Sequence, residues 1–275
     1  MRLIAQWLSE RLGQSFIVEN RPGAGGNIGA EAVAHATPDG YTLLSVSSPN
    51  AINATLYDNL NFDFIRDIAP VASIIRVPLV MEVNPSVPVN TVPEFIAYAK
   101  ANPGKISYAS GGIGTPQHVA AELFKMMTGV TMVHVPYRGA APGLMDLIAG
   151  QVQVMFDTTP ASMAQIRAGK TRPLAVTTLT RADVLPDLPT VAAFVPGYEA
   201  ISWFGIGAPA NTPTAIVDRL NGEINAGIAD PKIKARLLDL GGTVMPGSPA
   251  DFRKFIAAET EKWAKVIRFA DIKPE

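Results

Sequence analysis

The sequence contains no cysteine among its 275 residues. This absence excludes disulfides, thiolate zinc sites, iron–sulfur clusters and cysteine nucleophiles. Histidine is scarce as well, because the chain has only His35, His118 and His134. These three lie too far apart in sequence for a local metal motif such as H-E-x-x-H. We therefore expect neither a metal nor a cofactor.

Excess charge and long apolar runs are also lacking. The chain has 23 Lys+Arg against 24 Asp+Glu, so its formal net charge is −1. A near-neutral chain has no overall attraction to nucleic acid or to an anionic membrane, so nucleic-acid binding is not expected. The longest charge-free stretch, residues 200–217, holds two glycines and two prolines and does not suit a membrane-spanning helix. The sequence is that of a soluble protein.

Glycine and proline are abundant, with 23 residues of each. Together they make up about 17% of the chain, against roughly 12% in average usage. A chain that turns so often is not a helical bundle or a coiled coil. Its length allows one large domain or two domains of about 100 to 150 residues each.

The first segment is an amphipathic helix. Leu3, Ile4, Trp7 and Leu8 recur at helical spacing, and Gly13 supplies a stop. No capping residue, preceding strand or secretory signal stands before this helix. Two interpretations stay open: the domain begins with a helix, or the sequence omits a leading segment.

Strands and helices then alternate, which predicts α/β construction around a mainly parallel sheet. The helix that begins at Thr91 has a capping-box pattern, because Glu94 follows three residues later. The predicted strands cover residues 15–20, 41–46, 71–83, 105–110, 130–135, 152–156, 174–178 and 201–208. The predicted helices cover residues 30–36, 111–128, 136–149, 159–168 and most of 214–268.

Two extended segments, residues 71–84 and 198–209, enclose the middle series of strand-to-helix units. The chain is therefore expected to enter a second lobe once and to return once. This predicts a discontinuous first lobe, residues 1–77 plus 204–275, and a continuous second lobe, residues 78–203. A ligand cleft between the two lobes is expected, since such clefts commonly hold small molecules.

The residues that directly follow each strand are the candidates for ligand contact, because open parallel sheets bind ligands at the carboxyl ends of their strands. The most informative segment is Ser110-Gly-Gly-Ile-Gly-Thr-Pro-Gln-His118. Its glycines allow close backbone approach, Thr115 suits a helix N-cap and Pro116 suits the first helical position. A helix start with free amides attracts anions. A carboxylate fits this position without a lysine.

Similar helix starts follow other strands, at Tyr137-Arg138 and at Asp157-Thr-Thr-Pro160, where Thr159 is the expected cap. In the first lobe the equivalent position is Ser47-Ser-Pro-Asn50 with Asn53. Hydroxyls, amides and backbone donors with few charges suit reversible binding of a small polar anion. Asp157 stays open between accepting a ligand donor and binding the amides of its own helix.

Each of these residues also has a purely structural explanation. A glycine-rich turn can lack any ligand, and His134, between two valines of a strand, is expected to be a structural hydrogen-bonding residue. Of the histidines, only His118 is a candidate to face the cleft. A hydrolase would need Ser110 or Thr115 with His118 and Asp157, but no G-x-S-x-G elbow supports it. We therefore expect no enzyme, with an esterase or amidase as the alternative.

Several motifs, in order along nearly the whole chain, resemble the Bug (TctC-like) family of periplasmic solute-binding receptors of tripartite tricarboxylate transporters. They include Val18-Glu-Asn-Arg-Pro-Gly-Ala-Gly-Gly-Asn-Ile-Gly29, Pro38-Asp-Gly-Tyr-Thr-Leu-Leu44, Tyr108 to His118, Val135-Pro-Tyr-Arg-Gly-Ala-Ala-Pro-Gly143, Asp146-Leu-Ile-Ala-Gly-Gln-Val152 and Trp203-Phe-Gly-Ile-Gly-Ala-Pro209.

The resemblance implies a two-lobe, periplasmic-binding-protein-like fold of type II, the Venus flytrap. It also implies a monomeric periplasmic protein that captures a small organic carboxylate, such as a di- or tricarboxylate or an amino-acid or aromatic carboxylate. Such a receptor passes the ligand to integral membrane subunits of the transporter. Family members begin with an export signal, a first strand and a glycine-containing loop. None of these is present here, so we expect an incomplete sequence that lacks the first strand of lobe 1.

Carried over residue by residue, the resemblance implies a set of ligand-binding positions drawn from both lobes. The ligand-binding residues implied in this way are Ser47, Ser48, Asn50, Asn53, Ser110, Gly111, Gly114, Thr115, Gln117 and His118, with Asp157 and Thr158 placed to adjust specificity for the distal end of the ligand.

Overall fold

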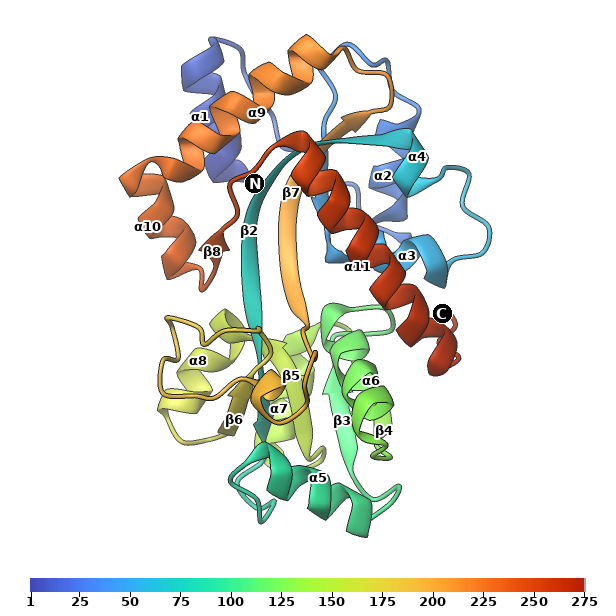
Figure 1. The fold of residues 1–275 in the computed structure, drawn as a ribbon, viewed down its shortest axis with the longest axis vertical. Coiled ribbons are helices and arrows are strands. Elements are labelled where there is room, and N and C mark those ends of the chain that lie inside the picture. Colours follow the sequence, from blue (N-terminus) through green and yellow to red (C-terminus); the bar gives the residue numbers. More distant parts are fainter. Residues whose placement is uncertain (275) are drawn as a thin grey trace. The chain divides into compact units, whose positions relative to one another are not determined.

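The computed structural model describes residues 1–274 (Figure 1). The chain divides into two compact units. Unit 1 comprises Met1–Arg76 and Trp203–Ala264, and unit 2 comprises Val77–Ser202 with the described residues from Lys265 onward. The sequence assigns residues 204–275 to the first lobe, whereas this division places the stretch from Lys265 with unit 2. The reason is that one unbroken helix, Pro249–Phe269, carries the chain past the boundary.

Unit 1 holds a small sheet covered by helices. Its helices are α1 (Arg2–Leu12), η1 (Ala24–Gly26), α2 (Asn27–Ala34), α3 (Ser48–Leu56), α4 (Phe64–Asp67), α9 (Thr214–Ala229), α10 (Pro231–Asp239) and most of α11 (Pro249–Phe269). Its strands are β1 (Leu44–Ser47), β8 (Thr243–Val244), the first half of β2 (Ile68–Val83) and most of β7 (Ile201–Pro209). Strand β7 lies between β1 and β2, and β8 pairs with β2 on its other edge.

Unit 2 holds a five-stranded sheet in the order β6, β2, β5, β3, β4. Its strands are the second half of β2, β3 (Ser107–Ser110), β4 (Val133–Pro136), β5 (Val154–Thr158) and β6 (Arg172–Val176). Its helices are α5 (Val92–Ala101), α6 (Pro116–Thr128), α7 (Ala140–Ala149), α8 (Thr159–Arg167) and η2 (Val191–Ala193). Helices α6 and α7 pack against both β3 and β5.

The sheets are mixed, so the expectation of a mainly parallel sheet is wrong. Strand β3 runs parallel to β4 and β5. Strand β2 runs antiparallel to β5, β6 and β8, and β1 runs antiparallel to β7. The reason is that β2 and β7, the long strands visible in Figure 1, carry the chain from one unit to the other and run against their neighbours.

The predicted strand over residues 15–20 is not formed. The segment is extended but belongs to no ladder, and the Ile17 side chain is 89% exposed. An isolated extended segment has no partners for its backbone N–H and C=O groups, so strand-like residues alone do not make a strand. Residues 16–19 and 43–45 line a pocket of about 130 Å³ together with the buried face of α1. Among the described residues, β1 pairs only with β7.

The opening helix α1 is confirmed, and its predicted apolar face is buried. Ile4 and Leu8 are 2% and 1% exposed, and Gly13 ends the helix with a left-handed φ of 68°. The helix packs against α9. The Trp7 Nε1 donates to the Glu223 carbonyl oxygen at 2.8 Å, so residues 216 apart in sequence form one contact.

Among residues 1–274, no helix combines the length and the apolar character that crossing a membrane requires.

Candidate ligand-binding site

The loop between β3 and α6 is the centre of the candidate site in unit 2. Pro116 is the first residue of α6 and Thr115 is its N-cap, as the sequence predicts. The Thr115 hydroxyl donates to the Gly112 carbonyl oxygen at 2.7 Å and makes no capping hydrogen bond. Gly112 and Gly114 have φ values of 123° and 73°, which side chains rarely adopt. This loop is therefore braced internally before any ligand binds.

Two neighbouring helix starts are joined through this loop. The Tyr137 N–H donates to the Ser110 carbonyl oxygen, and the Gly139 N–H donates to the Gly111 carbonyl oxygen, both at 3.1 Å. A Cβ atom on Gly111 would lie 3.3 Å from the Ala140 backbone nitrogen. The chain after β3 and the chain after β4 thus lie close together at one end of the unit 2 sheet, as expected for parallel neighbours.

Two imidazoles, those of His118 and His134, contact the loop through their ring nitrogens. His118 is 4% exposed, and its Nδ1 accepts the Gly114 N–H at 3.2 Å. The His134 Nε2 lies 2.7 Å from the Ser110 Oγ, which also accepts the Gly112 N–H at 3.2 Å. One nitrogen of His118 is therefore occupied by the loop, although His118 is among the predicted ligand contacts.

Asp157, at the end of β5, is the second polar centre. The Gln117 side chain and the Thr158 N–H both donate to its Oδ1, at 3.2 and 2.7 Å. Its Oδ2 and the Thr159 Oγ1 are buried without a hydrogen-bond partner in the described part of the chain. Burial raises the pKa of the Asp157 carboxyl, although these two hydrogen bonds oppose the shift. Asp157 thus binds its own helix start and keeps one free oxygen.

The sequence predicts Thr159 as the N-cap of α8, and this prediction is wrong. Thr158 is the N-cap residue, with φ −62° and ψ 137°, and Thr159 is the first helical residue. The error is one residue, because strand β5 continues through Thr158 and the helix follows directly.

Glu82 on β2 is a buried charged residue that the sequence analysis missed. The hydroxyls of Ser162 and Thr171 both donate to its carboxylate, the second at 2.6 Å. Burial raises the Glu82 pKa to about 7, the two hydroxyls oppose the shift, and the Asp157 charge adds to it. The sequence does carry a signal for Glu82, which is a single acid inside an apolar run. Because unpaired acids are rarely buried, such a residue is expected to have buried hydrogen-bond partners.

The predicted residues of unit 1 lie at the start of α3. The Asn50 Oδ1 accepts the Ser47 N–H at 2.8 Å, and the Ser48 Oγ accepts the Trp203 N–H at 2.8 Å. Together these bonds fix the helix start against β7.

Asn53 is joined to the glycine-rich turn that precedes α2. Its Nδ2 donates to the Gly25 carbonyl oxygen and to the Asn27 Oδ1, both at 3.0 Å. Asn27 was not singled out from the sequence, and its own Nδ2 is buried without a partner among the described residues. This amide is therefore a further donor at the unit 1 site.

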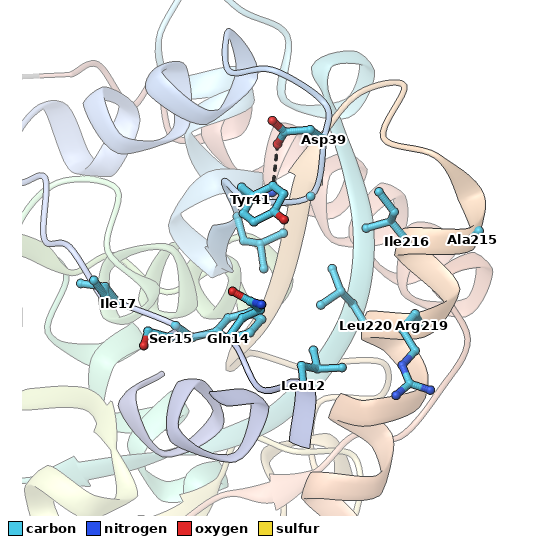
Figure 2. Close-up of a pocket in the computed structure, with 13 residues that line it drawn as sticks. Leu12, Gln14, Ser15, Ile17, Asp39, Tyr41, Ala215, Ile216, Arg219 and Leu220 are labelled. Atoms are coloured by element: carbon cyan, nitrogen blue, oxygen red, sulfur yellow. Dashed lines mark hydrogen bonds between the residues drawn. The ribbon is translucent and has the colours of Figure 1, made fainter. Parts of the chain in front are cut away.

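A pocket of about 500 Å³ in unit 1 contains none of the predicted ligand residues (Figure 2). Its walls come from the end of α1, the loops after it and the first turns of α9. The Asp39 Oδ1 accepts the Tyr41 N–H at 3.0 Å, and Arg219 pairs with Glu223 at 3.2 Å. With its charged groups engaged and its other walls largely apolar, this pocket offers little to an anion.

The hydrolase alternative is not assembled. The Ser110 Oγ contacts His134, and the His118 Nδ1 accepts from Gly114. The Ser110 hydroxyl also donates to the Gly112 carbonyl oxygen and accepts the Gly112 N–H, so it is engaged within its own loop. Asp157 contacts neither of these histidines through a hydrogen bond. Within residues 1–274, no three His, Cys, Asp or Glu side chains group to hold a metal ion.

The architecture defines the class. The α/β two-domain fold is that of periplasmic solute-binding proteins. The structure of R. palustris Rpa4515 with adipate has a TM-score of 0.86 and 43% sequence identity and covers 100% of this chain and 92% of that chain. The structure of MatC (Rpa3494) from Rhodopseudomonas palustris with bound malate has a TM-score of 0.82 and 30% identity over 97% of this chain and 92% of that one.

Residues 1–272 match the family described as "Tripartite tricarboxylate transporter family receptor", TctC, and the chain belongs to this family. Protein BugT of Bordetella pertussis is 36% identical over 270 residues, which are 97% of this chain and 83% of that protein. The expected Bug (TctC-like) relationship is therefore confirmed. The family and its structural neighbours are solute-binding proteins and not enzymes, and a family of periplasmic receptors implies an extracytoplasmic location.

Proposed function

We propose that this protein is a periplasmic, monomeric receptor that captures a small organic carboxylate and delivers it to the integral membrane subunits of a tripartite tricarboxylate transporter. The observation that carries the proposal is the braced loop of residues 110–115, which leads into α6 and its first amides, because the N–H groups of a first helical turn lack intrahelical partners. Adipate and malate in the two structural relatives support the ligand class.

The ligand carboxylate would bind where the first amides of α6 lack intrahelical partners. Gln117 and His118 follow Pro116, and the N-terminal N–H groups of a helix are free to bind an anion. A hydrogen bond to a charged group contributes about 1.5 to 3 kcal/mol. Three or four such bonds approach the roughly 8 kcal/mol of micromolar binding once ordering costs are subtracted. The proposed contacts in this loop are Ser110, Gly111, Gly114, Thr115, Gln117 and His118.

Unit 1 would present its own contacts through the start of α3. Its proposed contacts are Ser47, Ser48, Asn50 and Asn53. The Asn27 amide adds an unpartnered buried donor beside Asn53. Hydroxyls and amides of this kind bind carboxylate oxygens and ordered water without fixing a charge. This favours reversible capture over tight, salt-dependent pairing.

Asp157 and Thr158 would set specificity at the distal end of the ligand. The free Oδ2 of Asp157 is an acceptor, and a buried acceptor without a partner costs about 1 to 3 kcal/mol. A ligand hydroxyl, ammonium or protonated carboxyl would satisfy this oxygen. Acids that carry such a donor are therefore expected to bind more tightly than acids that lack one.

A thermal-shift panel tests the ligand class. The panel contains succinate, malate, glutarate, adipate, citrate, glutamate and benzoate, each with its uncharged amide or ester as the matched control. A bound acid at 100 times its Kd adds about 2.7 kcal/mol to the free energy of unfolding. We expect at least one acid, and not its amide or ester, to raise the unfolding temperature. If no acid does so, the proposal fails.

A second measurement tests delivery and oligomeric state. Light scattering of the liganded protein is expected to give the mass of one chain, 29.2 kDa. In cells, deletion of the gene is expected to abolish uptake of the acid identified by the panel, and re-expression is expected to restore uptake. Normal uptake in the deletion strain would contradict the role in transport.

A further inference from the structure

The two histidines of unit 2, the buried His118 and the half-buried His134, have no part in the ligand contacts beyond the one proposed for His118. The two residues belong to different elements, His118 to the first turn of α6 and His134 to β4. Both reach the same short loop, residues 110–114, from its inner side. Two titratable rings thus contact one side of the proposed ligand loop, and their protonation states bear on its conformation.

The rings are stacked face to face. The His118 and His134 centroids lie 3.8 Å apart, with 12° between the ring planes. The Tyr108 ring lies near both imidazoles, 4.8 Å from the His134 centroid at 14° and 6.2 Å from the His118 centroid at 25°. Two imidazolium charges at this separation would repel strongly in a buried position. The stack therefore excludes a state in which both histidines are charged.

The hydrogen bond of His118 requires a neutral ring. The Gly114 N–H donates to the His118 Nδ1, so that nitrogen carries no proton. Protonation of His118 at Nδ1 would turn the acceptor into a donor and break this bond. The His134 Nε2 holds the Ser110 Oγ at 2.7 Å, and the same hydroxyl accepts the Gly112 N–H. Each ring thus fixes a different part of the loop.

The surroundings supply one further cation and one anion. On α6, the Lys125 Nζ lies 2.7 Å from the Glu122 carboxylate, and the Tyr108 hydroxyl donates to the same oxygen. Lys125 lies 5.8 Å from the centre of the Tyr108 ring. Both partners engage the Glu122 Oε1, whereas its Oε2 is buried without a hydrogen-bond partner among the described residues. Glu122 is thus the acid near the rings, and its hydrogen bonds in the described part of the chain go to Tyr108 and Lys125.

We propose that His118 and His134 are positioning residues, which as a neutral stacked pair hold residues 110–114 in the ligand-binding conformation and release them when acid protonates His118. This inference rests on the proposed function of the loop. It assigns His118 a role through Gly114 that its amide contact with a ligand does not provide.

The titration of the pair agrees with this geometry. Burial lowers the pKa of His118 to about 3, and the charges of His134 and Lys125 add to the effect. Burial, followed by the Lys125 charge, lowers the pKa of His134 to about 4. The loop would then stay closed through the neutral range and open only in distinctly acidic solution.

The first experiment needs no ligand. The imidazole ¹⁵N shifts of the full chain are followed from pH 8 to pH 4, together with exchange of the Gly114 amide proton. We expect both rings to stay neutral down to pH 5, with His118 protonated on Nε2 only, and the Gly114 amide to stay protected. A titration midpoint at pH 6 or above for either ring would overturn the proposal, whatever the panel of acids shows.

The second experiment separates the acceptor from the ring. Asparagine places an oxygen near the position of Nδ1, whereas phenylalanine keeps the ring and removes the acceptor. We expect H118F to weaken binding of the acid identified by the panel about tenfold, and H118N to retain affinity within about threefold. Exchange of the Gly114 amide should accelerate in H118F only. Equal affinity and equal Gly114 protection in H118F and the wild type would contradict a positioning role.

At His134 the matched pair is H134Q, whose amide nitrogen reproduces Nε2, and H134F, which keeps only the stack. H134Q is expected to bind the acid within about threefold of the wild type, and H134F about tenfold more weakly. If the wild-type protein binds no acid, the proposed function fails, whereas the ¹⁵N titration and Gly114 exchange still decide the role of the histidines.

Discussion

The two units hold their strand-to-helix connections in place with different hydrogen-bonding groups. Each has a strand that leads into a helix with proline in its first turn, directly from β1 into α3 in unit 1 and through a loop from β3 into α6 in unit 2. In unit 1, side chains such as Ser48 and Asn53 accept or donate the bracing hydrogen bonds. In unit 2, glycine amides donate to Ser110 and to a histidine ring. Only the unit 2 loop therefore depends on the protonation of its supports.

The largest expected effect concerns acid. Burial lowers the pKa of folded His118 to about 3 from the usual 6.5, so between these values the unfolded chain binds more protons. The contribution of neutral His118 to the free energy of unfolding is complete above pH 6.5 and is lost as the pH falls from 6.5 towards 3. At pH 5 the loss is about 2 kcal/mol of unfolding free energy relative to pH 8.

The measurement is urea unfolding at several pH values, with H118N as the comparison. Glu82 has the opposite sign, because its raised pKa of about 7 makes its contribution present below pH 4.5 and lost as the pH rises through 7. The His118 effect is therefore read as the difference between wild type and H118N. H118F should flatten the profile equally, since both variants remove the same titrating group. Parallel profiles for all three proteins would remove the contrast between the units.

The next effect tests the side-chain bracing of unit 1. Asn53→Ala leaves the Gly25 carbonyl and the Asn27 Oδ1 without their shared donor. We expect a loss of about 1 to 2 kcal/mol in the free energy of unfolding, equal at pH 5 and pH 8. Asn61→Ala is the matched control, because Asn61 bonds Glu31 at the exposed surface and should cost under about 0.5 kcal/mol. A pH-dependent loss in Asn53→Ala would contradict the difference between the two loops.

The smallest effect separates backbone strain from ligand binding. Gly112→Ala places a side chain at φ 123°, where its Cβ lies 3.3 Å from the Tyr137 carbonyl oxygen. Gly104→Ala imposes a left-handed strain at φ 72° in open space. Each should cost about 1 kcal/mol of stability. Calorimetry with the bound acid should show weaker binding for Gly112→Ala alone, and equal affinities would place the loop outside the site.

The sequence predicted elements whose signals are local. The Thr91 cap of α5 is present, because its Oγ accepts the Glu94 N–H three residues on. The α1 stripe and the Gly13 stop are likewise formed by residues within one or two turns of each other. Patterns of this kind carry their physical cause in the neighbouring residues, so a single chain is enough to find them.

Features that depend on distant partners were not predictable in this way. Residues 15–20 have strand-like composition, yet pairing decides whether a strand forms. The stacking of His118 on His134 joins residues from two elements, and Glu82 is stabilised by Ser162 and Thr171, which are 80 and 89 residues away. The sequence was enough to find the candidate ligand loop, while the groups that support this loop were visible only in the fold.

The way the chain is divided has a consequence for biosynthesis. Unit 1 is built from Met1–Arg76 and Trp203–Ala264, and Trp7 donates to the carbonyl of Glu223. During translation, the amphipathic face of α1 therefore waits for α9 while more than 200 residues are made. Such a high sequence separation slows folding and leaves apolar surface open to association. The apolar face of α1 thus stays without its partner until α9 is made, whereas unit 2 can form most of its sheet before the ribosome reaches β7.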